Sequence, residues 1–176
     1  MPETLTAEAK ALIDRPNFAH LATLMPDGSP QSVPVWVGRE GDRLLVCTSE
    51  GSLKGRNTKR DPRVAISIVD FDNPYEEIQL RGRVVERRAD PDLKIMDPVS
   101  QKYIGKPFPM RSYEGRVALV IQVDRARYSK LPFDPLKDLL PVASVATNQF
   151  MLSVNPSVPA KTFQEFIEYA RNTKPA

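Results

Sequence analysis

The chain has 176 residues, of which 41% are hydrophobic and 27% charged, and its formal net charge is +3 at pH 7. This length suits one domain with a hydrophobic core, or one domain with an appendage. Seventeen prolines against eight glycines disfavour a long helical bundle and favour strands, turns and loops. No hydrophobic run approaches the ~20 residues of a membrane span, and the polar N-terminus is unlike a signal peptide. We therefore expect a cytoplasmic protein with no membrane partner.

The counts of cysteine, histidine and basic residues exclude several kinds of site. One cysteine and one histidine can form neither an intramolecular disulfide nor a complete metal site, so neither is expected. Cys47 lies in an apolar run and is expected to pack in the core. His20 has no partner carboxylate nearby in the sequence, which favours a structural role over a catalytic one. The basic residues cluster in one short stretch without interleaved aromatic residues, so we do not expect nucleic acid as a partner.

The N-terminal part of the chain is predicted to form a short helix followed by a three-stranded meander. Residues 5–14 carry apolar residues at helical spacing, and Thr6 is placed to cap the helix. Three strands are predicted over 18–24, 31–37 and 43–48, with turn-forming sequences between them. Pro34 cannot donate to a sheet ladder, so the second of these strands should lie at a sheet edge or bend there.

The stretch from residue 48 to residue 64 has an unusual charge. Ser52 is placed to cap a helix of about two turns that Asp61-Pro62 would end. The ten residues that begin at Lys54 contain five basic residues and one acid, a local balance of +4. Free N–H groups at the helix start, the capping hydroxyl, and Lys54 with Asn57 on one helix face together predict a phosphate-binding seat. A basic, solvated surface helix is the alternative interpretation of this pattern.

The remainder of the first 132 residues completes a mainly β fold. Further strands are predicted over 64–69, 75–88 and 116–123, and a helix with a fault at Pro98 is predicted over 90–105. Gly82, in the middle of the long strand, indicates a bulge or a close approach of another backbone. Six strands joined by short turns, with peripheral helices, predict a six-stranded β-barrel, because closure removes exposed edges.

The composition of the chain changes after Pro132. All eight glycines precede this residue, so we predict two regions, residues 1–132 and an appendage over 133–176. The appendage should contain an extended segment over 140–154 and a helix over 162–171. The apolar stripe of that helix cannot be buried by the helix alone. The appendage must therefore pack on the rest of the chain, pair with another chain, or be partly disordered.

Several short motifs follow one another in the order that one protein family shows. They are Phe18-Ala19-His20-Leu21-Ala22-Thr23-Leu24, Asp27-Gly28-Ser29-Pro30, Pro34-Val35-Trp36, Lys54-Gly55-Arg56-Asn57 and Arg60-Asp61-Pro62-Arg63-Val64. Over about the first 130 residues the chain resembles the flavin-binding split barrels related to pyridoxamine 5′-phosphate oxidase, and most of all the branch of deazaflavin (coenzyme F420)-dependent oxidoreductases. The further basic residues with which true pyridoxamine phosphate oxidases hold the substrate phosphate are not matched. Oxidation of pyridoxamine phosphate is therefore not expected.

The resemblance implies a homodimer with two sites for a cofactor, FMN or coenzyme F420, at the subunit interface, and hydride transfer to a small organic substrate. The residues it assigns to the cofactor are Lys54, Asn57, Ser52 and Arg56 at the phosphate, Thr48 and Ser49 as hydrogen-bonding groups, Pro34, Val35 and Trp36 against the ring, and Tyr75 and Gln79 beside it. The segment Lys102-Tyr103-Ile104-Gly105 resembles the part that the partner subunit contributes. The basic run Lys59, Arg60 and Arg63 would suit the longer anionic tail of the deazaflavin. A flavin-binding carrier or sensor without turnover would use the same residues and is the alternative function.

The C-terminal region resembles a different protein family. Residues 131–142 and 154–162 look like an internal piece of the periplasmic solute-binding proteins of tripartite tricarboxylate transporters. About 45 residues are too few for a two-lobed binding protein, so carboxylate binding is not expected here. We interpret this region as a fusion remnant or an appended packing element, and an interaction protein built on it is a third hypothesis.

Overall fold

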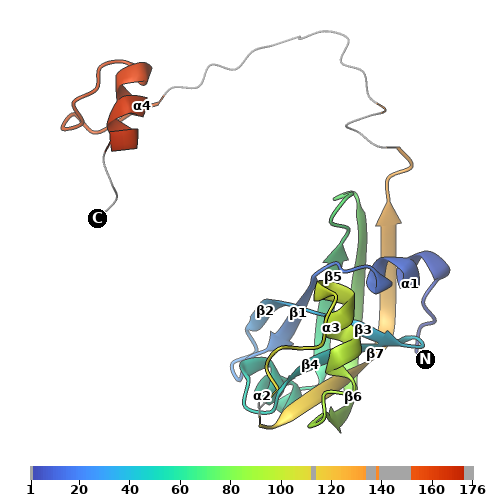
Figure 1. Cartoon of the computed structure of the whole chain (residues 1–176). Helices are drawn as coiled ribbons and strands as arrows, with labels where there is room; N and C mark the ends of the chain where they lie inside the picture. The colour runs from blue at the N-terminus through green and yellow to red at the C-terminus, as the bar shows by residue number, and fades with distance from the viewer. Residues whose placement is uncertain (1, 112–113, 134–137, 139–151, 173–176) are drawn as a thin grey trace. The chain divides into compact units, whose positions relative to one another are not determined.

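The computed structural model describes residues 2–111, 114–133, 138 and 152–172. The chain divides into two units, Met1–Phe133 and Asp134–Ala176. The first unit is mainly an antiparallel β-sheet with a few helices around it (Figure 1). Among the described residues, no helix is long and apolar enough to cross a membrane.

Seven strands of the first unit form one sheet, in the order β2-β1-β5-β6-β7-β4-β3. Their bounds are β1 Ala19–Leu24, β2 Pro30–Val35, β3 Gly38–Glu40, β4 Arg43–Ser49, β5 Arg63–Val69, β6 Glu76–Ala89 and β7 Arg116–Lys130. The predicted count of six is not confirmed, because residues 38–40, expected to lead into a turn, pair with β4 instead. β2 and β3 end the strand order and do not pair with each other in the described part of the chain, so the sheet is not the closed barrel we predicted.

Strand β2 lies at the edge of the sheet, as Pro34 predicted, and pairs with β1 only. The strand ends at Val35, two residues earlier than expected. The reason is a tertiary contact: the N–H of Val37 donates to the hydroxyl of Tyr103 at 3.1 Å rather than to a neighbouring strand. Trp36 therefore lies after the end of β2 and takes no part in the pairing of β2 with β1.

The hydrophobic core lies between the inward-facing side chains of the strands and helix α1 (Ala7–Asp14). Thr6 caps this helix as predicted, and its hydroxyl accepts a hydrogen bond from the N–H of Ala9 at 3.2 Å. Leu12 and Ile13 of the helix are fully buried against the sheet. Along β1 and β5, alternate residues such as Leu21 and Ile66 face this core, so the residues between them face outward.

Gly82 marks a bulge between β6 and β7, as predicted from the sequence. The strand register shifts between Arg81 and Gly82, and a Cβ added at Gly82 would lie 2.1 Å from the backbone oxygen of Gln122. We expect Gly82→Ala to lower the free energy of unfolding by roughly 3 kcal/mol, because a backbone strand must move to make room. Gly51→Ala is the matched control, since a Cβ there meets nothing within 4 Å. Urea unfolding of both variants measures the difference, and equal stabilities would contradict the close approach.

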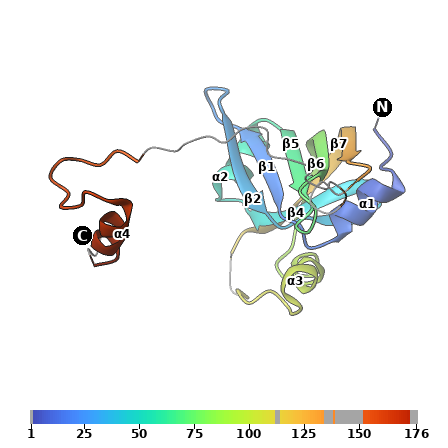
Figure 2. The same cartoon turned by 90° about the horizontal axis from the view of Figure 1, so that it is seen from above.

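Helix α3 (Met96–Ile104) begins six residues later than predicted, and the expected fault at Pro98 is wrong. The carboxylate of Asp90 accepts hydrogen bonds from the N–H groups of Ile95 and Met96, at 3.0 and 2.9 Å, and so organises the approach to the helix. Pro98 then falls in the first turn, where its missing N–H has no intrahelical acceptor to lose. The helix stands on one side of the sheet (Figure 2).

The second unit contains helix α4 (Phe163–Asn172), close to its predicted bounds. The hydroxyl of Thr162 accepts from the N–H of Glu165 at 3.2 Å, and the Glu165 carboxylate accepts from the N–H of Lys161 at 2.7 Å. The first bond caps the helix start, and the second holds the residue before the cap against the first turn. Most of the extended segment predicted over 140–154 lies outside the described residues.

Candidate functional site

Helix α2 (Leu53–Arg60) begins as predicted, with Ser52 as its cap. The Ser52 hydroxyl accepts from the N–H of Gly55 at 3.0 Å, donates to the carbonyl of Ser49 at 2.8 Å, and lies 2.8 Å from the hydroxyl of Thr48. Thr48 and Ser49 thus hold the helix start to the end of β4. In the described part of the chain, no acceptor is found for the N–H groups of Leu53 and Lys54. The first turn of α2 therefore presents two N–H donors and the positive end of the helix dipole.

A hollow of about 290 Å³ opens beside this helix start. We call it the Lys54 hollow. It is lined by Phe18, Pro34, Val35, Trp36, Cys47, Lys54, Met96 and Phe108. The fold therefore brings together four of the predicted site residues, because the end of β2 and the first turn of α2 meet here. Aromatic and aliphatic side chains make up the other walls.

Lys54 is the one charged side chain in the Lys54 hollow. It is half-buried and has neither a hydrogen bond nor an ion pair with any described residue. Burial lowers the pKa of the Lys54 ammonium below its ordinary value, since no carboxylate offsets the loss of water. An anion bound beside it would supply the missing charge partner.

Trp36 is held in place by aromatic neighbours from α3 and from the segment after it. Its ring stacks on Tyr103 with centroids 5.0 Å apart and planes 4° apart, and Phe108 meets it edge-on at 6.1 Å. The Tyr103 hydroxyl donates to the carbonyl of Asn17 at 2.7 Å and accepts from the N–H of Val37. The resemblance associated Tyr103 with a partner subunit, whereas here it contacts Trp36 of its own chain.

Lys102, next to Tyr103, completes this anchorage of α3. Its ammonium donates to the carbonyls of Ile13 and Val37, at the end of α1 and beyond the end of β2. Burial lowers the pKa of Lys102 to about 8. The helix that carries Met96 into the Lys54 hollow is thereby tied to both α1 and the segment that holds Trp36.

Tyr103→Phe is expected to loosen Trp36 without removing the stacked ring. The substitution leaves the N–H of Val37 and the carbonyl of Asn17 without the bridging hydroxyl, which costs about 1–3 kcal/mol for such buried groups. We expect the near-UV circular dichroism of Trp36, the only tryptophan in the chain, to decrease. Tyr75→Phe is the control, since Tyr75 is 45% exposed. An unchanged spectrum in Tyr103→Phe would show that the hydroxyl does not hold Trp36.

The side chains of Asn57 and Arg56, both predicted to lie at the phosphate, make contacts within the protein. Asn57 is 1% exposed, and its amide donates to the Thr23 hydroxyl at 3.0 Å, so it holds α2 against β1. The Arg56 guanidinium is exposed and donates to the carbonyl of Gly51. Neither side chain lines the Lys54 hollow. Asn57 therefore positions the helix, and Lys54 alone presents its charge to the hollow.

Two further predicted residues lie elsewhere in this chain. Tyr75 precedes β6, and its N–H donates to the side chain of Asn73 at 3.1 Å. Gln79 is exposed on the outer side of β6, where its amide donates to Glu77 at 3.0 Å. Neither lines the Lys54 hollow.

The thiol of Cys47 and the imidazole of His20 were both expected to be structural. Cys47 lines the Lys54 hollow, where burial first and nearby Asp90 second raise its pKa to about 12, so the thiol stays protonated at neutral pH. His20 is exposed on the outer face of β1 and is not a core residue. Within the residues that the structure describes, no three His, Cys, Asp or Glu side chains gather in a way that could hold a metal ion.

Two profiles of known protein families match the sequence of this chain. The profile of the pyridoxamine 5′-phosphate oxidase family matches residues 5–130. The chain belongs to this pyridoxamine 5′-phosphate oxidase family. A second profile, of the tripartite tricarboxylate transporter family receptor, matches residues 115–175, which overlaps β7 and covers the described part of the second unit. A search of curated proteins finds no match.

Solved structures agree with membership of the pyridoxamine 5′-phosphate oxidase family. A structure described as an F420 reductase is 31% identical over 72% of this chain and 98% of its own, with a TM-score of 0.61. A conserved hypothetical protein, Rv2991 from Mycobacterium tuberculosis, is 24% identical over 83% of this chain and 94% of its own, also with a TM-score of 0.61, and shares the fold. A heme binding protein from Mycobacterium smegmatis is 27% identical over 69% of this chain and 52% of its own, with a TM-score of 0.56.

Proposed function

We propose that this member of the pyridoxamine 5′-phosphate oxidase family is an oxidoreductase that uses bound coenzyme F420 or FMN to transfer hydride to a small organic substrate. The observation that supports the proposal is the half-buried ammonium of Lys54, which lacks a partner among the described residues and faces an aromatic hollow at the start of α2. The similarity to an F420 reductase at 31% identity supports the same class of cofactor.

The residues of the Lys54 hollow fit the two ends of such a cofactor. Lys54 and the two N–H groups of the first turn of α2 would bind a phosphate, and Trp36 and Pro34 would lie against a planar ring. A bound flavin or deazaflavin would supply the hydride chemistry. Phe18, Met96 and Phe108 would keep water from the ring. The Cys47 thiol stays protonated and therefore would not attack the ring as a nucleophile.

We further propose that the functional unit is a homodimer. A hollow of about 290 Å³ is slightly smaller than the roughly 300–1,000 Å³ of ligand pockets, which favours a cofactor site of which one chain supplies only part. A second copy would add the rest, and Gln79 and Tyr75 are the exposed residues expected to contribute. Light scattering should give twice the chain mass of 19.8 kDa. A monomer that binds the cofactor with full affinity would contradict this part of the proposal.

Of the two cofactors, we favour coenzyme F420. The basic run no longer supports this choice, because Arg60 donates to the carbonyl of Leu24 and Arg63 is paired with Asp61. The choice rests instead on the similarity to an F420 reductase. Titration of the protein with F420, FMN and heme, followed by absorbance, tests it directly. We expect tighter binding of F420, and binding of heme alone would overturn the proposed function.

The alternative function is a carrier or sensor that binds the cofactor without turnover. It has a specific basis: the lining of the Lys54 hollow holds no carboxylate and no imidazole, and its one thiol, Cys47, stays protonated at neutral pH. Mixing reduced cofactor and protein with a panel of quinones and unsaturated ketones separates the two functions. Oxidation of the cofactor faster than in the absence of protein supports the oxidoreductase, whereas tight binding without oxidation by any acceptor supports the carrier.

A further inference from the structure

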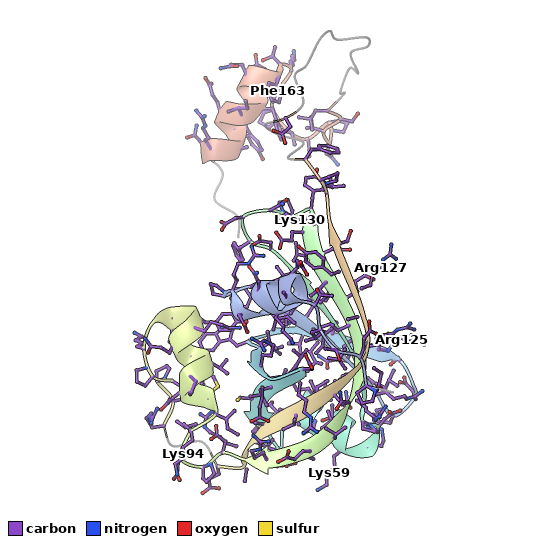
Figure 3. The ribbon with its side chains drawn as sticks, turned by 90° about the vertical axis from the view of Figure 1, so that its right-hand side faces the viewer. Lys59, Lys94, Arg125, Arg127, Lys130 and Phe163 are labelled. Carbon is purple, nitrogen blue, oxygen red and sulfur yellow. The ribbon has the colours of Figure 1, made fainter. Side chains whose placement is uncertain are left out.

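A second, larger hollow lies on the outer face of the sheet, away from the Lys54 hollow. It has a volume of about 580 Å³, and its floor is made of small side chains from β1, β2 and β5, namely Ala22, Ser32, Ala65 and Ser67. Arg81, Arg125 and Arg127 also line it, so we call it the arginine hollow. In Figure 3, Arg125 and Arg127 project from β7 away from the body of the unit, on the side opposite α3. The two hollows share no lining residue.

The three arginines are neighbours across two strands. Arg81 of β6 lies directly opposite Arg125 of β7, and the next outward pair is Gln79 with Arg127. Directly opposed residues have Cβ atoms roughly 5 Å apart, and like charges at that spacing destabilise a sheet. The three arginines therefore do not stabilise the isolated sheet, and a bound anion would offset their repulsion.

The backbones of these three arginines pair within the sheet, but none of their guanidinium groups has a hydrogen bond or an ion pair with another residue in the described ranges. The other arginines of β6 differ: Arg83 pairs with Asp124, Arg87 with Glu50, and Arg88 with both Glu40 and Glu86. Of the acids beside the arginine hollow, Asp124 is occupied by Arg83, and Glu77 accepts from Gln79. The arginine hollow therefore carries three positive charges that no ion pair among the described residues neutralises, although the Glu77 carboxylate, which accepts from the neutral amide of Gln79, lies on the same strand as Arg81.

The polar groups of the arginine hollow are mostly donors. Each guanidinium carries five N–H groups in a planar fork that matches a carboxylate or phosphate. The hydroxyls of Ser32 and Ser67, the Gln79 amide and the His20 imidazole add donors around the floor. An anion can accept from several of these donors and also neutralise their charge, whereas a neutral ligand leaves the charge uncompensated and a cation is repelled. Three separate forks suit a ligand with more than one anionic group.

We propose that the arginine hollow is a binding site for a small organic anion that carries two or more carboxylate or phosphate groups. Within one chain the site shares no lining residue with the Lys54 hollow, and of its lining only Gln79 is also expected to reach the cofactor bound to a second copy. Its volume lies within the roughly 300–1,000 Å³ of small-molecule sites. A second copy of the chain packed over this face is the competing occupant, and it would exclude such an anion.

Isothermal titration of the full chain with citrate and with pyrophosphate, in low salt, tests the proposal and separates carboxylate from phosphate ligands. We expect saturable binding of at least one probe that weakens as salt increases, and no binding of acetate. The double variant Arg125→Gln/Arg127→Gln should bind at least about tenfold more weakly. The matched control is Arg83→Gln/Arg88→Gln, which removes the same charge from arginines that already have carboxylate partners.

A second measurement needs no variant. Phenylglyoxal modifies accessible arginines, and peptide mass spectrometry reports each site. The bound probe should protect Arg125 and Arg127 but not Arg83. The proposal is overturned if neither probe binds to the wild-type chain. A second copy packed over this face would give that result. The proposal is also overturned if both double variants lose affinity equally, because the effect would then be one of net charge.

Discussion

Replacing Lys54 with methionine is expected to weaken the binding of F420 or FMN by about 10- to 100-fold. The ammonium is the one charged group of the Lys54 hollow, and a hydrogen bond to a charged group contributes about 1.5–3 kcal/mol. Methionine keeps the length of the side chain and its contact with the aromatic walls, so the change isolates the charge. Equilibrium titration of each cofactor, followed by absorbance or fluorescence, gives the ratio of dissociation constants.

Lys59→Met is the matched control for this substitution. Lys59 lies on the same helix, exposed to solvent (Figure 3), and does not line the Lys54 hollow. It removes the same charge from α2 at a distance from the proposed phosphate. We expect it to change affinity less than twofold at physiological salt, since exposed charges are screened. Equal losses in the two variants would mean that α2 attracts the cofactor only through its overall charge.

Arg15→Gln is expected to lower the free energy of unfolding by about 3–5 kcal/mol at neutral pH. Arg15 follows α1 and pairs with both Asp70 and Glu76, whose side chains are only 4% and 6% exposed. The substitution leaves two nearly buried carboxylates without their shared guanidinium. Glu76 keeps Lys130 and Tyr128 at 3.0 and 3.1 Å, whereas Asp70 loses its only ion pair in the described part of the chain. Urea unfolding at pH 7 measures the difference from the wild type.

The effect of Arg15→Gln should depend on pH in a defined direction. Burial would raise the pKa of Glu76, but its hydrogen bonds to Lys130, Arg15 and Tyr128 outweigh burial and lower that pKa. Because the pKa of Glu76 is lower in the folded protein, its ionised carboxylate stabilises the fold when the pH is above the pKa of the unfolded chain, about 4.3. This contribution is lost as the pH falls through the pKa of the folded protein. The stability gap between variant and wild type should therefore be full above about pH 5 and shrink in more acidic solution. A gap that is small at pH 7, or that grows in acid, would contradict this account.

The local features of α2 could be predicted because they depend on neighbouring residues. Ser52 as a cap and Asp61-Pro62 as a stop are signals that act within one turn of helix, and both are confirmed. The direction of Asn57 could not be predicted in the same way. Its burial depends on Thr23, which is 34 residues away and meets it only through the packing of α2 on β1.

The walls of the Lys54 hollow were predicted only in part. Pro34, Val35 and Trp36 came from the resemblance, whereas Phe18, Met96 and Phe108 come from segments far apart in the sequence. No spacing pattern in the sequence links those three residues. The hydrogen bonds of Asp90 and Lys102 fix the start of α3 and its contacts with α1 and the end of β2, and these contacts position Met96. The same tertiary contacts end β2 early, through the bond from Val37 to Tyr103.

The most direct test of the central proposal is a crystal structure of the protein with F420 bound. We expect the phosphate of the cofactor within hydrogen-bonding distance of the Lys54 ammonium, and the ring beside Trp36 in a site completed by a second copy of the chain. A cofactor that binds elsewhere, with the Lys54 hollow empty and Trp36 in contact only with Tyr103 and Phe108, would contradict the proposed function.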